Sequence, residues 1–477
     1  MSNRAAAARN TFVLSDIHQS DAQPVDPKRP LWKRFKGRDL FVDDSFERFL
    51  NHLRELADGE IELILNGDIF DFDSVTRIPE APNFPVHWLE RRRGLHSEGP
   101  KSLFKMSVII EDHPVFFAAL KRFLSDGHRV VIVIGNHDIE LQWPMVQAMI
   151  RDHLDLPEAD QDRLLFCEWF YVSNDDTLVE HGNQYDRYCV SANPISPTVN
   201  YLGTDRIRLP FGNLAGKYML NGMGLFNPHV ESSFIKSLRE YVVFFGRYML
   251  RVQPLLAWSW FWTAMVTLTV SIREGFLPAL RDPFTLEERV EGIAERANAT
   301  PRLVRGLLAL RVHPAVFNPF HIARELWLDR ALVFGLVMFG TFQLFSFLNV
   351  FVDLSIWYWV LFFILMLPVF IFYARGINSD VKNYERGLRR RLPNAAKLAS
   401  VGRIILGHTH DERHTEIGGV EVINTGTWSP AFHDVECTQP FGRKCFAWVR
   451  PDGPNGERVA DLFEWTDPGS RVIERQD

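Results

Sequence analysis

Residues 129–138 read RVVIVIGNHD, and this stretch decides the class of fold. Its first part, VVIVI, is a run of β-branched residues, which is the composition of a strand buried inside a sheet. Gly135 ends the run, and the polar residues NHD follow it directly. The stretch therefore predicts a buried strand over 129–134 whose carboxyl end carries metal-competent side chains.

The same alternation of short strands and helices extends outward to both ends of the chain. Earlier apolar runs predict strands at 11–14 and 61–65, and helical periodicity covers 43–57 and 114–125. After residue 402 the chain returns to short strands separated by Gly and Pro, which we expect at 403–406, 420–424, 446–450 and 458–464. The pattern predicts an α/β layer architecture in which both ends belong to one kind of domain.

Five short blocks concentrate the side chains that bind metals. They are DIH (16–18), NGDIFD (66–71), GNHD (135–138), HGN (181–183) and GHTH (407–410). A lone His near a strand end is usually structural, so each block carries little weight alone. Four blocks, however, directly follow a strand-like run, as in FVLSDIH, IELILNGD, VVIVIGNHD and RIILGHTH. Because open α/β sheets bind ligands outside the carboxyl ends of their strands, we expect the blocks to converge at one edge.

The order of these blocks, DxH, GDxxD, GNHD, an isolated His and GHxH, resembles the calcineurin-like metallophosphoesterase superfamily. The resemblance covers both ends of the chain and omits its centre. It implies a four-layer αββα sandwich with a two-metal centre. The implied ligands are Asp16, His18 and His410 for one metal, Asn136, His181 and His408 for the second, and Asp68 as the bridge between them.

The residue types in this ligand set agree with the implied chemistry. Carboxylate, amide and imidazole ligands suit borderline divalent ions. For the two ions that the resemblance implies we expect Mn, with Fe or Zn as the alternatives. Two such ions acidify a shared water into a nucleophile near neutral pH. The resemblance also makes His137 the group that protonates the leaving group and Asp71 the carboxylate that orients it. The alternative for Asp71 is an ordinary turn carboxylate that caps the following segment.

Within the superfamily, the blocks favour one branch. Protein Ser/Thr phosphatases follow GDxxD with Arg and Gly, whereas Phe72 and Asp73 follow it here. GDIFDF, HGN and VEVINTGTW (420–428) are similar to the branch that contains the UDP-2,3-diacylglucosamine pyrophosphohydrolase of lipid A synthesis. That branch has GNRD as its third block, so His137 stands where the branch has Arg. The resemblance implies hydrolysis of a phosphoester or pyrophosphate bond.

We expect the metallophosphoesterase domain in two parts, residues 1–185 and 394–477. Between them lies a long helical stretch, residues 186–393, which we name the central insertion. It contains an apolar helix at 252–272 and a membrane hairpin at 331–374. Because the insertion separates two implied metal ligands, it places the active site at the bilayer surface.

Two uncharged runs, 331–352 and 354–374, predict the hairpin because each exceeds the roughly 18 apolar residues of a membrane-span candidate. Only Asp353 separates them, so we expect a turn near 349–353. A pair of buried core helices is the alternative. Lys and Arg outnumber acidic residues on both flanks, which places both flanks in the cytoplasm by the positive-inside rule.

The run 252–272 suits an interfacial or re-entrant helix as well as a span, because it contains Pro254, several Ser and Thr, and three Trp. The ligands before and after the insertion must meet on one side of the bilayer, so the number of crossings is even. The hairpin supplies two. We therefore expect this run in the interface, with Trp258, Trp260 and Trp262 near the headgroups.

A basic cluster lies between the second and third blocks, in HWLERRRGLHSEGPK. Arg91, Arg92 and Arg93 are candidates to bind a phosphate or diphosphate through bidentate contacts. The alternative is a basic surface helix or a contact with lipid headgroups.

Composition excludes other classes. The formal net charge of −6 over 477 residues gives no overall basic surface, so we expect no nucleic-acid partner. Four Cys without a CxxC pair are too few for a disulfide framework. The first ten residues are too short and polar for a signal peptide, so we expect a cytoplasmic N-terminus.

Together these features favour a membrane-associated, dinuclear-metal hydrolase acting on an amphiphilic or lipid-linked substrate at the cytoplasmic membrane face, with membrane lipids as partners. Two alternatives remain. One is a phosphatase or phosphodiesterase for a soluble nucleotide or phosphoprotein, with the hairpin only an anchor. The other is a membrane scaffold whose metal site is structural or inactive.

Overall fold

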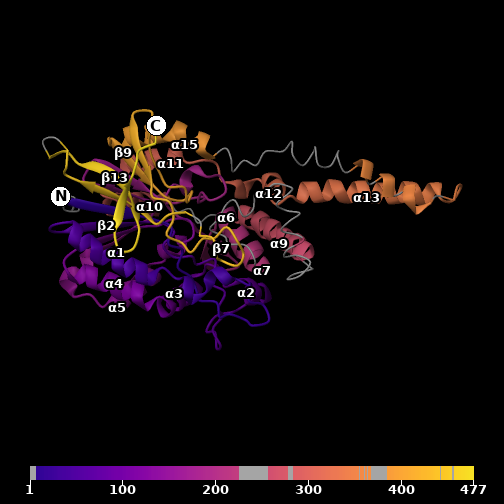
Figure 1. The fold of residues 1–477 in the computed structure, drawn as a ribbon, viewed down its shortest axis with the longest axis horizontal. Coiled ribbons are helices and arrows are strands. Elements are labelled where there is room, and N and C mark those ends of the chain that lie inside the picture. The colour runs from indigo at the N-terminus through magenta and orange to yellow at the C-terminus, as the bar shows by residue number, and fades with distance from the viewer. Residues whose placement is uncertain are drawn as a thin grey trace.

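The computed structural model describes residues 7–224, 246, 256–277, 283–353, 355–358, 360–362, 364–366, 384–440, 442–453 and 456–476. Two sheets form the centre of the molecule, helices cover them, and one long helix projects from the body (Figure 1). The predicted α/β class is confirmed.

The larger sheet combines the two ends of the chain. Its N-terminal strands pair in parallel, and its C-terminal strands extend it in antiparallel pairs, with β1 as the strand that joins the two sets. In spatial order the seven strands are β14 (Ser470–Ile473), β13 (Val459–Trp465), β12 (Cys445–Arg450), β1 (Asn10–Leu14), β2 (Ile61–Asn66), β3 (Arg129–Val133) and β4 (Leu164–Cys167).

The smaller sheet joins the two ends of the chain as well. Its central strand β9 pairs in parallel with β11 on one side and with β6 on the other. In spatial order the five strands are β10 (Arg413–Ile417), β11 (Val420–Asn424), β9 (Arg403–Leu406), β6 (Thr177–Glu180) and β5 (Phe170–Ser173).

The two sheets pack face to face, and helices cover both outer faces. Val13 and Val131 of the larger sheet share one buried cluster with Val179 and Ile405 of the smaller sheet. The layers therefore run helix, sheet, sheet, helix. The helices on the larger sheet are α1 (Asp43–Leu56), α3 (Gly99–Asp112), α4 (Pro114–Ser125) and α5 (Pro144–Leu154), and those on the smaller sheet are α10 (Pro283–Arg296), α11 (Pro301–Leu310) and α15 (Tyr384–Ala399).

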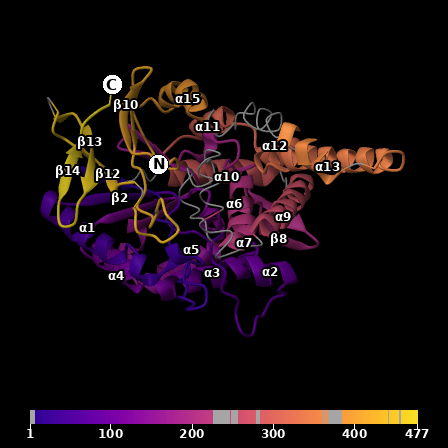
Figure 2. The ribbon, with the colours of Figure 1, turned by 45° about the vertical axis from the view of Figure 1, so that its right-hand side comes forward.

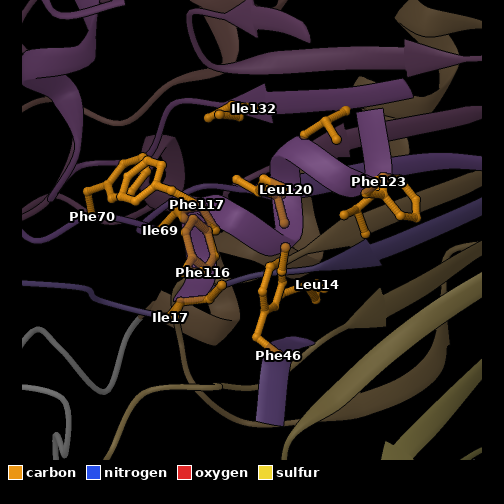
Figure 3. Close-up of a cluster of buried hydrophobic side chains, with 14 of the residues drawn as sticks. Leu14, Ile17, Phe46, Ile69, Phe70, Phe116, Phe117, Leu120, Phe123 and Ile132 are labelled. Carbon is orange, nitrogen blue, oxygen red and sulfur yellow. The ribbon is translucent and has the colours of Figure 1, made fainter. Parts of the chain in front are cut away.

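Aromatic side chains fill the layer between the larger sheet and its helices (Figure 3). Phe46 of α1 stacks on Phe116 of α4 with ring centroids 4.5 Å apart. Phe70, in the loop after β2, stacks on Phe117 with centroids 6.0 Å apart. Ile17, in the loop after β1, belongs to the same buried cluster. The core therefore anchors the two loops that carry the DIH and NGDIFD blocks.

Part of the outer helical layer comes from the central insertion. α10 and α11 contribute buried residues, among them Val290, Ile293 and Val304, to the cluster on the smaller sheet. The backbone N–H of Val172 in β5 donates to the carbonyl of Ala297 at 3.0 Å. The insertion thus packs as part of the sandwich rather than only beside it.

The remaining described part of the insertion lies beside the sandwich and contributes to two small buried clusters, one of which also includes Ile139 (Figure 2). Ala264 and Ile322 are buried together with Phe211 in the other cluster. The elements of this part of the insertion are β7 (Thr198–Tyr201), β8 (Thr204–Ile207), α6 (Phe211–Ala215), the π-helix η6 (Gly216–Leu220), α7 (Asn221–Met223), α9 (Leu256–Phe276) and α12 (Pro319–Glu325).

The projecting helix, α13 (Leu328–Leu348), contains most of the first predicted membrane run. It is the one helix in the described part of the chain that is long and apolar enough to cross a membrane. Only 6% of its most apolar window is buried, so a buried core helix is excluded for this segment. Turns follow at 349–351, within the region where we expect the hairpin to turn. Most of the second run, 354–374, lies outside the described residues.

Helix α9 covers most of the run 252–272 and has two unlike faces. Thr263, Thr267 and Ser271 are buried against the body, whereas Trp258 and Trp262 are more than half exposed. The spacing of four between the buried residues defines a helical stripe. One side of this helix therefore packs on the body of the protein, and the other side is exposed.

Candidate metal centre

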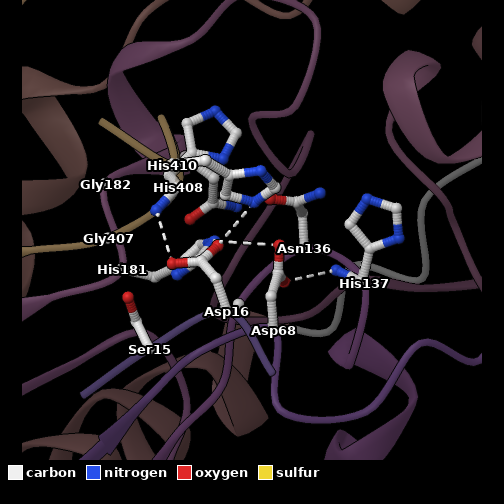
Figure 4. A network of polar contacts seen from close by, with 12 residues as sticks. Ser15, Asp16, Asp68, Asn136, His137, His181, Gly182, Gly407, His408 and His410 are labelled. Atoms are coloured by element: carbon white, nitrogen blue, oxygen red, sulfur yellow. Dashed lines mark hydrogen bonds and ion pairs between the residues drawn. The ribbon is translucent and has the colours of Figure 1, made fainter. Parts of the chain in front are cut away.

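The five blocks converge at one edge of the two-sheet core, where strand carboxyl ends meet (Figure 4). DIH, NGDIFD and GNHD follow β1, β2 and β3 of the larger sheet, whereas HGN and GHTH follow β6 and β9 of the smaller sheet. The loops after β1 and β2 run side by side, because the N–H groups of Asp16 and His18 donate to the carbonyls of Gly67 and Asp68 at 3.0 and 2.9 Å. The site therefore bridges both sheets.

Left-handed backbone marks most of the implied ligands. The φ angles are +57° at Asp16, +56° at His18, +53° at Asp68, +71° at His408 and +57° at His410. Residues other than Gly rarely adopt this conformation, and such strain clusters at functional sites.

The glycines in the motifs make room for these ligands. A Cβ at Gly407 would lie 2.5 Å from Asp16 Oδ2, and a Cβ at Gly67 would lie 2.5 Å from the His181 ring. A Cβ at Gly135 would overlap the carboxylate of Asp68. Close packing of backbone against ligand side chains thus requires Gly in GD, GN and GH.

Asp16, His18 and His410 form the first group of potential ligands. His410 Nε2 lies 3.1 Å from Asp16 Oδ1, and the Nε2 atoms of His18 and His410 lie 3.2 Å apart. All three side chains are at least nine-tenths buried. Two imidazole nitrogens and a carboxylate oxygen therefore face one point, as the ligand assignment expects.

Asp68, His181 and His408 form the second group. His181 Nε2 lies 3.1 Å from Asp68 Oδ2, and the rings of His181 and His408 have centroids 5.3 Å apart. His18 Nε2 lies 4.0 Å from the same Asp68 oxygen. The Asp68 carboxylate thus lies between the two groups, which is the position a bridging ligand needs.

Asn136 is the remaining ligand that the resemblance implies for the second group. Its Oδ1 is buried and has no hydrogen-bond partner in the described structure. An orphaned buried amide oxygen costs free energy unless a cation or water contacts it. Together with the surrounding imidazoles and carboxylates, this oxygen fits a divalent metal ion, so the donor set agrees with the chemistry predicted from the sequence.

The electrostatics of the site also fit cations. Burial raises the pKa of Asp16, but the neighbouring His181 and His410 outweigh it and hold that pKa well below its usual value. Burial lowers the pKa of His181, yet Asp68 and Asp16 overcome it and raise the pKa to about 9. The carboxylates therefore produce a strong negative potential that stabilises positive charge at this point.

His137 lies beside the ligands but is more exposed than they are, with 18% of its side chain accessible. Its Nδ1 lies 3.2 Å from Asp71 Oδ1 and 3.7 Å from Asp73 Oδ2, and its ring centroid is 5.0 Å from that of His18. Burial lowers the pKa of His137, but Asp71 and Asp68 dominate and raise it to about 10. A partly exposed, readily protonated imidazole next to the ligands has the position of a general acid.

Asp71 makes the contacts that both interpretations of it expect. Besides contacting His137, its carboxylate accepts the backbone N–H of Ser74 at 3.0 Å and the Ser74 hydroxyl. The turn after β2 therefore fixes the carboxylate that holds His137.

The arginine cluster lies on α2 (Trp88–Arg93). Arg91 and Arg92 are exposed, and Arg92 lies over the Trp88 ring at 4.8 Å. Arg93 is partly buried next to Gly222 of α7. Phosphate binding by these side chains stays a prediction.

Sequence reasoning missed several residues that contact the site. Asp73 and Asp186 follow the second and fourth blocks within a few residues, so acidic residues near a block were the available signal. Asn213 of α6 contacts both Asp73 and Asn136, and Tyr384 of α15 packs on His408 with ring centroids 5.7 Å apart. Neither has a sequence signal, because both belong to segments far from the motifs.

One of the comparisons with known proteins found a match, and it lies in the N-terminal part of the chain. Residues 10–210 match the family model described as Calcineurin-like phosphoesterase, a range that includes Asp16, Asp68 and His181 but ends before His408 and His410. The match supports the superfamily and indicates a metal-dependent phosphoesterase. Searches of curated proteins and of solved structures found no match.

Proposed function

We propose that this phosphoesterase is a membrane-associated, dinuclear-metal hydrolase that cleaves a phosphoester or pyrophosphate bond in an amphiphilic or lipid-linked substrate at the cytoplasmic membrane face. The convergence of the seven candidate ligands from both ends of the chain is the observation that carries the proposal. Manganese is the metal we favour for this mixed ligand set.

The two ligand groups would hold one ion each, with Asp68 contacting both. Bound divalent ions acidify water and neutralise negative charge on phosphoryl oxygens. The chain itself supplies the proton for the leaving group from His137. Because Asp71 accepts the Nδ1 hydrogen of this imidazole, Nε2 is the atom that faces the substrate.

Helix α13 supports the membrane part of the proposal. Leu332, Phe334, Phe342 and Leu344 lie on different sides of the helix and are each at least 48% exposed, which is a costly arrangement in water. A bilayer would cover the exposed apolar side chains all around the helix, whereas a single protein partner would cover only one side of it. Helix α9 would lie at the membrane surface, with the exposed Trp258 and Trp262 at headgroup level.

The substrate class follows from where the insertion joins the domain. The insertion leaves the domain just after His181 and returns before His408. The proposed membrane segment is therefore connected on both sides to candidate ligands of the same site. A substrate anchored in the bilayer would reach such a site without leaving the membrane. The proposed branch, with its lipid-linked pyrophosphate chemistry, is consistent with this arrangement.

Activity assays separate the proposal from its alternatives. The purified full-length protein, stripped with chelator and reloaded with Mn²⁺, should hydrolyse a chromogenic phosphodiester and should prefer a detergent-dispersed lipid pyrophosphate over a nucleotide or phosphopeptide. Preference for the soluble substrates would favour a phosphatase with a membrane anchor. Two bound ions without any turnover would favour a scaffold.

A further inference from the structure

We infer that the central insertion supplies the positioning residues for the second metal ion, through Asp186 acting on His408 and Asn213 acting on Asn136. The inference rests on the proposed dinuclear centre and adds that the insertion controls one of its two ions. It concerns residues that hold ligands in place rather than the ligands themselves.

Asp186 fixes the ring of His408. Its Oδ2 lies 3.1 Å from His408 Nε2, while its Oδ1 accepts the backbone N–H of Tyr188 at 2.8 Å. The carboxylate is 85% buried, since only 15% of the side chain is exposed, so it is held at both oxygens in a protected position. Because a carboxylate accepts hydrogen bonds, Nε2 must carry the proton, and Nδ1 is left as the metal-binding atom.

Tyr384 fixes the same ring from another side. Its ring meets that of His408 in a T-shaped contact, and its hydroxyl donates to the carbonyl of Gly182 at 3.2 Å. Gly182 follows His181, another ligand of the second ion. Asp186 and Tyr384 lie at the start of the insertion and near its end, so both of its ends contact one ligand.

Asn213 fixes the third ligand. Its Nδ2 donates to the backbone carbonyl of Asn136 at 2.7 Å and to Asp73 Oδ2 at 2.5 Å, and its own Oδ1 lies 3.5 Å from Asn136 Nδ2. Asn213 is fully buried. Since the amide nitrogen of Asn136 faces Asn213, its Oδ1 points the opposite way, which is the oxygen that has no hydrogen-bond partner.

Within the described residues, the ligands of the first ion are held by hydrogen bonds from the two parts of the domain and not from the insertion. His408 N–H donates to Asp16 Oδ2 at 3.1 Å, and the Trp428 N–H donates to the Asp16 carbonyl at 3.0 Å, both from the C-terminal part of the domain. His181 is held by its own domain as well, through Nδ1 and the carbonyl of Asn66 at 2.9 Å. Loss of the insertion contacts should therefore affect one ion selectively.

Metal binding tests the inference without any activity measurement. Metal-free full-length protein in detergent is titrated with Mn²⁺ by calorimetry, and the Mn²⁺ EPR spectrum is recorded at two ions per chain. For D186N, D186A and N213L, one ion should bind about 10- to 100-fold more weakly while the other changes by less than about threefold. The EPR signature of two coupled ions should give way to that of a single ion.

Two variants serve as matched controls. D205N alters an exposed carboxylate on β8 of the same insertion, and N298A removes an amide that donates to the Val172 carbonyl away from the ligands. Both should bind two ions as the wild type does. Equal weakening of both ions in D186N and N213L, unchanged binding in both, or a third ion held by Asp186 and Cys189 would overturn the inference. Wild-type protein that binds a single ion would instead contradict the proposed dinuclear centre.

Discussion

Ligand side chains at this site pack closely against the backbone of glycines, so a larger residue does not fit there. At Gly407, a Cβ would lie 2.5 Å from both Asp16 Oδ2 and Ser15 Oγ, so G407A should displace Asp16 or shift the GHTH loop. We expect Mn²⁺ affinity to fall at least tenfold and the free energy of unfolding of the metal-free protein to drop by about 1–3 kcal/mol, the usual range for overpacking. Calorimetry and urea unfolding measure the two effects.

Gly402 provides the control for this prediction, because a Cβ there meets nothing within 4 Å. G402A should bind Mn²⁺ as the wild type does. If G407A does so too, the close packing around Asp16 does not determine metal affinity.

His137 is the residue whose role differs from that of its neighbours. It is more exposed than the ligands, and its Nδ1 faces Asp71. H137A should therefore keep both ions but lose about 10²- to 10⁴-fold in kcat, the scale of a lost general acid. Metal analysis and steady-state kinetics on the same preparation check this, and loss of an ion would make His137 a ligand.

Among the elements, α2 depends on one buried carboxylate. Glu90 accepts the N–H groups of His87 and His96 at 2.8 and 2.9 Å and the ammonium of Lys101 at 2.6 Å. Burial raises the pKa of Glu90, but Lys101 and the two backbone donors outweigh it and lower the pKa below its ordinary value. The folded state therefore favours the ionised form of the Glu90 carboxyl group.

E90Q should destabilise the protein by about 2–3 kcal/mol at pH 7, because it leaves the buried Lys101 without its closest anion. A lowered folded-state pKa contributes stability above the unfolded pKa of about 4.3, and this contribution disappears as the pH falls through the folded value. The difference between wild type and E90Q in urea unfolding should thus stay constant from pH 7 to about pH 5 and shrink as the pH falls below the unfolded value of about 4.3. E111Q, at an exposed ion pair with Arg77, should change stability little at either pH.

The boundaries of strands that consist of β-branched runs were predictable from the sequence. A helix with charged residues on its buried face was not. The strands expected at 403–406 and 420–424 are β9 and β11 without change. Helix α3 escaped prediction because Lys101 and Lys105 lie on its buried side, where Lys105 is fully buried against Glu140. Such a pair breaks the apolar periodicity that identifies a buried helix face.

The candidate site was predictable wherever a ligand directly follows a strand. The resemblance supplied the ligand set, and the implied ligands lie together because the strands that they follow end at one edge. Asn213 and Tyr384 were not predictable, because only the folded insertion brings them to Asn136 and His408. The packing of α10 and α11 on the smaller sheet was hidden for the same reason.

For the whole molecule, the two-part domain restricts membrane topology. His408 and His410 meet Asp16 and Asp68 at one centre, so the chain enters and leaves the insertion on the same side of a bilayer. With α13 as one arm of a hairpin, position 353 should face away from the catalytic domain. In a Cys-free background, D353C should react with an impermeant maleimide only from the opposite side to E111C.

Labelling of both positions from the same side would show that α13 does not carry residue 353 across the membrane. In that case α13 would enter one leaflet without spanning, or would cover another protein surface. The metal centre would be unaffected by either result, because its ligands come from the sandwich.

The central claim, one site with two ions joined by Asp68, is tested most directly by D68A. Metal content per chain is measured on purified wild type and variant after equilibration with Mn²⁺, together with turnover of a chromogenic phosphodiester. Because Asp68 lies between both ligand groups, we predict that D68A loses both ions together and nearly all turnover. Retention of two ions per chain in D68A would contradict the account.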